Sequence, residues 1–283
     1  MIILILIFLG LAFGSFVNAF VYRLFEADKH TYGIGLKKAK RSTFNLSVVN
    51  GRSICVHCKH ELSYLDLIPV LSWFFLRGKC RYCKKPISWQ YPAVEVTTAF
   101  LFVSSYVFWP YSVNSLYGWI IFGFWLIYLI GFMSLLVFDI KWMLLPNKIV
   151  YSLLGIYVVQ LGIMLIFGNI GISGLISILL GAISISGFFW AIFQISGGNW
   201  IGGGDVKLAL LLGALAGGVV EAVLVLFIAS VLGSIIGGGA LLLEKRFNMK
   251  TQLPFGPYLM TATIIVVLFG SSLVDWYKNL IYL

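Results

Sequence analysis

The stretch SLYGWIIFGFWLIYLIGFMSLLVF, residues 115–138, decides the fold class, because its 24 residues contain no charged side chain. A helix that crosses a bilayer needs roughly 20 predominantly apolar residues, so this run is long enough to span one. The whole chain has the same character: of its 283 residues, 60% are hydrophobic and only 11% are charged, with a mean hydropathy of +0.99. Soluble domains have about 25% charged residues. The composition therefore predicts an integral membrane protein.

Seven more apolar runs accompany this one, and none shows the alternation that is typical of a membrane β-barrel. We therefore expect an all-α polytopic membrane protein with about eight transmembrane helices. The expected domains are a first transmembrane helix (1–22), a cytoplasmic loop domain (23–92) and a transmembrane helical bundle (93–283). The eight expected spans, of which the sixth is short and glycine-rich, cover residues 2–22, 93–110, 115–138, 148–168, 172–195, 205–218, 220–243 and 255–274.

Basic residues are concentrated between the first two spans. Residues 23–92 contain 13 of the 20 lysines and arginines but only four acidic residues, and so carry +9 of the net charge of +10. Because cytoplasmic loops of membrane proteins carry an excess of lysine and arginine, this segment is predicted to face the cytoplasm beside anionic lipid headgroups. Both termini then lie outside. A net charge of +10 would also suit nucleic-acid binding. The clustering of the basic residues in one segment favours a cytoplasmic loop instead.

The first apolar run has a second interpretation, a cleaved signal peptide. Signal peptides begin with a basic segment, whereas the first basic residue here is Arg23, which follows the run. We therefore expect a retained membrane anchor. The sequence assigns no role to the insert that comes next, residues 27–50.

All four cysteines lie in the basic segment, in the pairs CVHC (Cys55, Cys58) and CRYC (Cys80, Cys83). Each CxxC turn offers two thiolates, and two such turns complete the tetrahedral site that Zn²⁺ prefers. The cysteines fill all four positions, so the predicted zinc ion is structural. Two redox pairs and four incidental thiols are the alternatives, with His57 and His60 available as substitute ligands.

Two aspartates stand at the ends of apolar runs. Asp139 follows the run 115–138, and Asp205 opens the sixth run in IGGGDVKLAL (201–210). Ionisable residues at membrane depth are costly and usually functional. The predicted topology puts both at the cytoplasmic boundary, where an intervening helix pair allows them to meet. Two adjacent carboxylates share one proton, and so supply the base and the acid that peptide hydrolysis by water requires.

The glycines before Asp205 refine this hypothesis without deciding it. Gly202, Gly203 and Gly204 allow a substrate backbone to approach closely, and they match no phosphate-binding glycine pattern. An aspartate pair equally suits a proton relay or a cation site in a transporter. Of the other acidic residues outside the loop, Glu95 is expected to pair with a loop cation or to line the site. The remaining three are expected to be solvated helix ends: Glu221, Glu244 and Asp275.

Motifs along nearly the whole chain resemble those of bacterial type IV prepilin leader peptidases, which are membrane aspartic proteases of the GxGD type. The N-terminal motif is GSFVNAFVYRL (14–24), the cysteine-bearing loop spans 52–88, and the second span begins with YPAVEVTTA (91–99). The aspartate motifs are FDIKWMLLPN (138–147) and GGGDVKLALLLGA (202–214), and PFGPYLMTA (254–262) follows. This ordered set is far more specific than a GxGD sequence alone.

The resemblance implies that Asp139 and Asp205 are the catalytic pair, and that the three glycines and Lys207 support the site. It implies cleavage, at the cytoplasmic face of a bacterial inner membrane, of the basic leader of type IV prepilin or pseudopilin precursors, between glycine and phenylalanine. It also implies methylation of the new N-terminus by S-adenosylmethionine, although no glycine-rich strand–helix signature of a methyl-donor fold is found. A cation or proton transporter and a non-catalytic pilus or secretion assembly protein are the alternatives.

The cysteine-bearing loop is also rich in apolar residues. Because a pilin-like leader is basic, we do not expect the basic loop to bind it by charge. We expect instead that its apolar residues pack on the membrane domain or touch the substrate: Leu65, Leu67, Ile68, Leu71, Trp73, Phe74 and Phe75.

Overall fold

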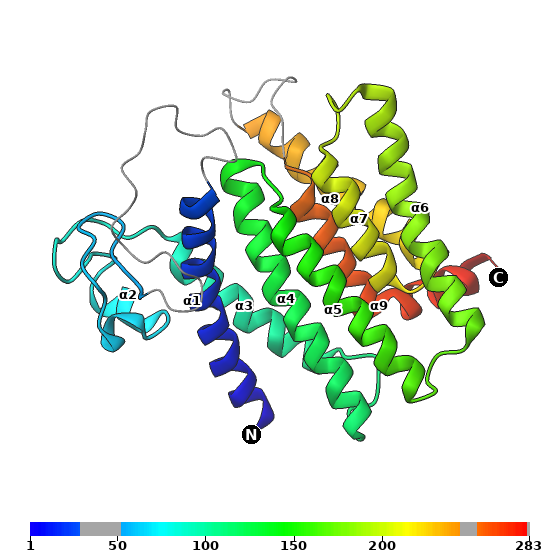
Figure 1. The fold of residues 1–283 in the computed structure, drawn as a ribbon, viewed down its shortest axis with the longest axis horizontal. Helices are drawn as coiled ribbons and strands as arrows, with labels where there is room; N and C mark the ends of the chain where they lie inside the picture. Colours follow the sequence, from blue (N-terminus) through cyan, green and yellow to red (C-terminus); the bar gives the residue numbers. More distant parts are fainter. Residues whose placement is uncertain (29–51, 244–253, 282–283) are drawn as a thin grey trace. The chain divides into compact units, whose positions relative to one another are not determined.

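A computed structural model describes residues 1–28, 52–243 and 254–281 of the chain (Figure 1). Most of the insert 27–50 and the expected helix end Glu244 lie outside the described residues. The described residues are largely helical and form no β-strand. The chain divides into two compact units, Met1–Val107 and Phe108–Leu283.

Each of the eight expected spans forms a helix. Six of these helices are long and apolar enough to cross a membrane, which confirms the prediction of an all-α polytopic membrane protein. The other two are α3 and α7. With 14 residues, α7 is about 21 Å long, shorter than the roughly 30 Å hydrocarbon core of a bilayer. The eight helices are α1 (Ile2–Asp28), α3 (Gln90–Val107), α4 (Leu116–Trp142), α5 (Asn147–Ile166), α6 (Ile172–Ser196), α7 (Gly203–Ala216), α8 (Val219–Leu243) and α9 (Gly256–Ile281).

In the first unit, α1 and α3 pack closely through glycine. A Cβ atom on Gly10 would collide with Cα of Ala99, and one on Gly14 with Cα of Glu95. Small residues allow helices in membranes to approach to backbone contact. One turn beyond Gly14 on α1, the side-chain amide of Asn18 donates to the carbonyl oxygen of Tyr91, at the start of α3, at 3.1 Å. The two helices are therefore joined both by close packing and by a hydrogen bond.

We expect Gly14→Val to destabilise this helix pair by about 1–3 kcal/mol, the usual cost of overpacking, because the added side chain must displace the backbone of α3. Thermal unfolding of the purified protein in detergent measures the effect. Ala12→Val adds side-chain volume to the exposed face of the same helix and should change the unfolding temperature little. Equal losses in the two variants would contradict the packing argument.

Between α1 and α3, the cysteine-bearing loop contains a 3₁₀-helix η1 (Tyr64–Leu67) and the short helix α2 (Leu71–Phe75). Trp73 packs within the loop: its Nε1 donates to the carbonyl oxygen of Ile87 at 3.2 Å, and its ring centroid lies 4.3 Å from that of Trp89. The other aromatic residues of α2, Phe74 and Phe75, are 71% and 77% exposed. Trp73 therefore holds the loop together, while its neighbours face outward.

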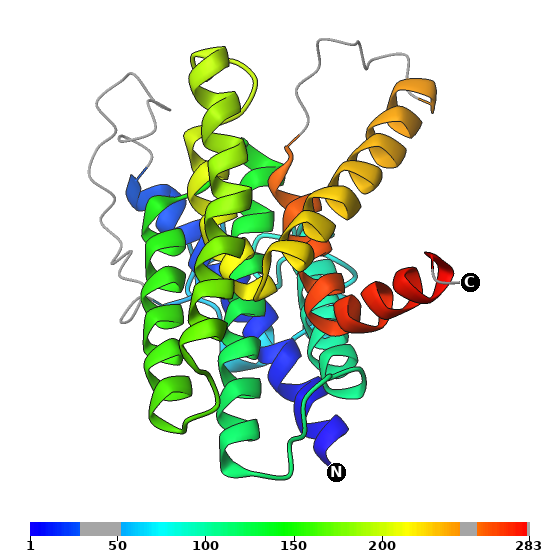
Figure 2. The same cartoon turned by 90° about the vertical axis from the view of Figure 1, so that its right-hand side faces the viewer.

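In the second unit, α7 contacts α5, α6, α8 and α9. It meets α6 at Gly213, where an added Cβ would lie 2.5 Å from the carbonyl oxygen of Gly181. The hydroxyl of Tyr157 on α5 donates to the carbonyl oxygen of Ala214 at 2.7 Å. Figure 2 shows α8, coloured yellow to orange, crossing α9. The shortest of the eight helices is thus held by neighbours on several sides.

Candidate functional site

Asp139 lies in the last turns of α4 and is only 5% exposed. The helix ends three residues later at Trp142, and the capping residue Met143 adopts the left-handed conformation (φ 52°) and donates its N–H to the carbonyl oxygen of Asp139 at 2.8 Å. Pro146 then precedes the first residue of α5, consistent with the rarity of proline inside helices. The short link between α4 and α5 therefore starts within one helical turn of Asp139.

Asp205 lies in the first turn of α7. Its Oδ2 accepts the backbone N–H of Gly202 at 3.3 Å, and its own N–H donates to the carbonyl oxygen of Gly202 at 3.1 Å. A carboxylate in the first turn satisfies a free N–H group and interacts favourably with the helix dipole. Local structure therefore fixes the side chain of Asp205 at the start of its helix.

The start of α9 completes the site. A Cβ atom on Gly256, the first residue of α9, would collide with Oδ2 of Asp139. The side chain of Leu145 packs between this glycine and Gly204, since it lies within 3.0 Å of a Cβ built on Gly204 and 3.7 Å of one built on Gly256. Asp205 is close enough to Asp139 for their charges to interact. The end of α4 and the starts of α7 and α9 thus meet around two carboxylates.

One oxygen at this site lacks a partner. Oδ2 of Asp139 is buried and lies against the backbone of Gly256, and no described residue gives it a hydrogen bond of good geometry. Buried polar atoms without partners are rare in native proteins, and each calls for an explanation. The lone pairs of this oxygen are free to accept a proton or a hydrogen bond from a reacting molecule, so the arrangement suits proton transfer.

The other expected site residues lie at or just after the start of α7. Gly202, Gly203 and Gly204 form the start of α7. Lys207 lies one turn further along and donates from Nζ to Oδ1 of Asn147 at 3.0 Å, so its charge is directed to the start of α5. Sequence reasoning missed Leu145, Asn147 and Gly256. All three lie in quoted motifs, but nothing in their chemistry alone marks them as members of a site.

Glu95 belongs to the first unit and is 6% exposed. Its Oε2 accepts the backbone N–H of Val70 at 2.7 Å, and Ser15 also bonds to its side chain. Val70 has a φ of 60°, a conformation that is a genuine outlier for a β-branched residue. Glu95 was expected either to pair with a cation of the loop or to line the site. It does pair with the loop, but its partner there is the backbone amide of Val70 rather than a cation.

The two CxxC pairs have the same backbone structure, repeated 25 residues apart. In the first, Cys55 N–H donates to the carbonyl oxygen of His60 and Lys59 N–H to that of Cys55, both at 2.9 Å. In the second, Cys80 N–H donates to the carbonyl oxygen of Lys85 at 2.9 Å, and Lys84 N–H donates to that of Cys80 at 3.0 Å. Lys59 and Lys84 have nearly equal positive φ angles of 60° and 59°. Each pair is therefore a tight turn that presents two sulfur atoms.

The four Sγ atoms all lie within 4.8 Å of one another, and those of Cys55 and Cys83 are 3.9 Å apart. Zinc–sulfur bonds of about 2.3 Å place the sulfurs of a regular tetrahedron roughly 3.8 Å apart, so this cluster can hold a metal ion. Burial acts to raise the pKa of the Cys55 thiol, but the backbone N–H groups of Cys58 and His57 outweigh it and lower the pKa to about 7. The backbone of this turn thus favours the thiolate form of Cys55, one of the four thiolates that a metal would require.

Asp66 of η1 braces the second turn. Its Oδ1 accepts from Nε of Arg81 at 2.7 Å, and its Oδ2 accepts from the hydroxyls of Ser63 and Tyr82 at 3.0 and 3.3 Å. Burial acts to raise the pKa of Asp66, but the bonds from Arg81 and Ser63 outweigh it and hold the pKa below its ordinary value. Asp66 therefore stays charged at neutral pH and links η1 to the cysteine turn.

Comparison with known proteins assigns the chain to a family. Residues 8–109 match the Bacterial Peptidase A24 N-terminal domain, and residues 126–238 match the Type IV leader peptidase family. The chain is 34% identical to a prepilin leader peptidase/N-methyltransferase of Aeromonas hydrophila, over 96% of this chain and 92% of that protein. This chain belongs to the type IV leader peptidase family. The resemblance seen in the motifs is thereby confirmed.

Other prepilin leader peptidase/N-methyltransferases give the same result. That of Pseudomonas aeruginosa is 32% identical over 97% of this chain and 93% of its own length, and that of Bacillus subtilis is 32% identical over 84% and 89%. No solved structure matches. The N-terminal match contains the four cysteines, and the leader peptidase match contains both aspartates.

Proposed function

We propose that this member of the type IV leader peptidase family is a membrane aspartic endopeptidase that removes the leader of type IV pilin-like precursors, with Asp139 and Asp205 as its catalytic pair. The observation that carries the proposal is the approach of two carboxylates, 66 positions apart in sequence, within reach of each other's charge at the junction of three helix ends. No observation favours a transporter or an assembly protein in the same way.

The two carboxylates supply both proton transfers of hydrolysis. The ionised carboxylate takes a proton from a water molecule, whose oxygen attacks the carbonyl carbon of the scissile bond. The protonated carboxylate gives its proton to the leaving nitrogen as the C–N bond breaks, so the pair ends with one proton, as it began. Gly202 fixes Asp205 through its N–H group, and the missing side chain of Gly256 leaves room beside Oδ2 of Asp139.

We propose that the protein lies in the inner membrane with the site and the cysteine-bearing loop facing the cytoplasm. The excess of basic residues in 23–92 supports this orientation. Phe74, Phe75 and Trp89 are each more than 70% exposed, and aromatic residues favour the boundary between lipid and water. Since Trp73 packs within the loop, the exposed phenylalanines are the better candidates for contact with lipid or substrate.

We propose that the metal ion is zinc, held by Cys55, Cys58, Cys80 and Cys83 as a structural crosslink of the loop. The names of the relatives also lead us to propose N-methylation of the product, for which S-adenosylmethionine would supply the methyl group. The described residues form no strand, and hence no strand–glycine loop–helix unit of the kind that binds dinucleotides. No residue is therefore assigned to the methyl donor.

The test is cleavage of a pilin-like precursor by the purified protein in detergent, with S-adenosylmethionine present and the product masses measured. A peptidase cleaves without any ion gradient, and a methyltransferase adds the mass of one methyl group to the mature product. A protein that moves ions in liposomes but leaves every precursor intact would overturn the proposal in favour of a transporter.

We expect Gly256→Ala to lower the cleavage rate by about 100-fold, the scale of loss that follows a displacement of about 1 Å at a reacting group. The added methyl group must push Asp139 or the start of α9 away. Gly239→Ala on α8 is the matched control, because its Cβ meets no atom within 4 Å. Initial rates with a saturating precursor separate the two variants, and similar rates would argue against the close contact.

A further inference from the structure

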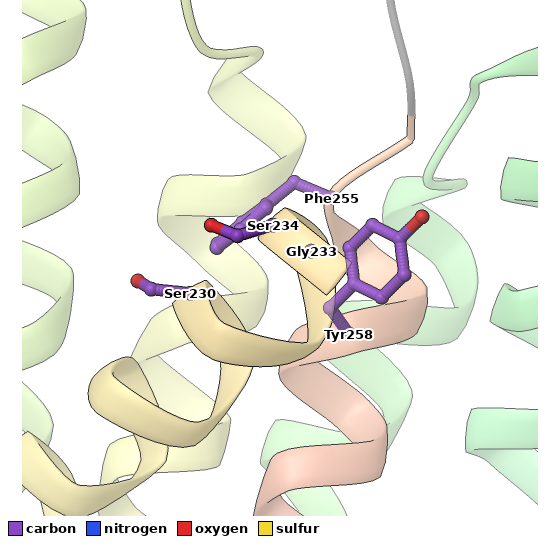
Figure 3. A pocket seen from close by; sticks show the side chains of 5 residues that line it. All are labelled: Ser230, Gly233, Ser234, Phe255 and Tyr258. Atoms are coloured by element: carbon purple, nitrogen blue, oxygen red, sulfur yellow. The ribbon is translucent and has the colours of Figure 1, made fainter. Parts of the chain in front are cut away.

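A pocket of about 350 Å³ lies between α8 and the start of α9 (Figure 3). Phe255 and Tyr258 provide aromatic walls, with ring centroids 6.2 Å apart. Gly233 of α8 lies opposite them: a Cβ on this glycine would be 3.4 Å from the Tyr258 ring and 3.6 Å from the Phe255 ring. Ser230 and Ser234 complete the lining. The pocket is thus mainly apolar, with two hydroxyl groups from one helix.

The pocket lies beside Gly256, the residue that contacts Asp139. Its two aromatic residues flank Gly256, whose backbone lies against Oδ2 of Asp139. Phe255 also packs on Phe189 of α6, with the ring centroids 5.9 Å apart, which holds this wall in place. A group bound in the pocket is therefore only a few residues of extended chain from a peptide bond held at the carboxylates.

We infer that this pocket receives one large apolar or aromatic side chain of the precursor, from a residue close to the scissile bond, and so selects the substrate. This inference rests on the proposed peptidase function. Ligand pockets usually measure about 300–1,000 Å³, so this one has room for a side chain but not for a whole helix. Offset and edge-on packing against aromatic walls favours an aromatic guest.

The Ser230 hydroxyl on the pocket lining does not oppose an apolar guest. The Ser230 hydroxyl donates to the carbonyl oxygen of Leu226 at 2.8 Å, within its own helix, so its donor is already satisfied. Gly233 controls the available volume, because any side chain at this position projects toward both rings. Filling the pocket from Gly233 should therefore exclude a large guest and tolerate a small one.

The experiment uses precursors in which each residue flanking the scissile bond is, in turn, phenylalanine or alanine. At one of these positions the parent protein should prefer phenylalanine. Gly233→Leu should lower kcat/KM for that phenylalanine precursor by about 10–100-fold, the range expected for apolar pocket discrimination, while changing kcat/KM for its alanine counterpart less than about threefold. Gly233→Ala should shift the preference in the same direction by a smaller factor.

Gly238→Leu is the control, since it adds the same side chain to α8 at a position where a Cβ meets no atom within 4 Å; it should leave the preference unchanged. Cleavage of the alanine precursor by Gly233→Leu shows that the variant is folded and active. An unchanged preference in both Gly233 variants, or equal slowing of every precursor, would overturn the inference. If the parent cleaves no precursor, the proposed function itself has failed.

Discussion

Asp139→Asn and Asp205→Asn are each expected to lower the rate of precursor cleavage by about 10²–10⁴-fold, the usual contribution of a positioned acid or base. Asparagine keeps the size of the side chain but can neither take a proton from water nor pass one to the leaving nitrogen. The two residues act as one unit, so the double variant should be little slower than either single variant. Single-turnover cleavage in detergent, followed by product mass, measures all three.

Asp275→Asn is the control for loss of one carboxylate from the second unit. Asp275 lies near the end of α9, where its side chain is 71% exposed and Oδ1 is 4.0 Å from Nζ of Lys278. Its substitution should leave the rate unchanged. Cleavage at the parent rate by Asp139→Asn or Asp205→Asn would contradict the catalytic assignment. If the loss in the double variant equals the product of the two single losses, the two carboxylates act separately.

Cys80→Ser is expected to reduce bound zinc from one ion per chain to nearly none and to expose the cysteine-bearing loop to protease. Cys80 is only 2% exposed, and its sulfur belongs to a cluster that contains all four cysteines of the chain. Structural zinc sites contribute about 10–16 kcal/mol of apparent binding free energy in small zinc-finger peptides. No other single contact in the loop is expected to approach this value.

Metal content by mass spectrometry and limited proteolysis of the purified protein check this expectation. His57→Asn is the control, because His57 lies inside the first turn and is exposed but is not part of the sulfur cluster. It should retain the metal. A full complement of zinc in Cys80→Ser would exclude the four-sulfur site, and a zinc-free parent with a protease-resistant loop would show that the metal is dispensable.

Much of the fold was predictable because it depends on local composition. Long uncharged runs form helices in a membrane, and every one of the eight runs does so here. The ends of the helices depend on a different signal, namely the residues that stop a helix. The first run was expected to end at residue 22, before Arg23, whereas α1 continues to Asp28, since residues 23–28 contain neither glycine nor proline to stop a helix.

Long-range contacts account for what the sequence could not predict. The CxxC spacing defines the sulfur cluster because each turn is local, but the contact of Gly256 with Asp139 joins residues 117 positions apart. Glycine has no side chain to indicate a role, and Leu145 resembles any other apolar residue. Packing decides such contacts, so they emerge only when the helices are placed together.

The repeated cysteine turns have a consequence for the order of events during synthesis. The first turn leaves the ribosome 25 residues ahead of the second, a delay of about one to five seconds at ordinary elongation rates. During that interval Cys55 and Cys58 can offer only half of a tetrahedral set. The loop can therefore close around a metal ion only after Cys83 has followed α1 out of the ribosome. Metal capture by all four sulfurs thus cannot precede the synthesis of the first helix and the loop.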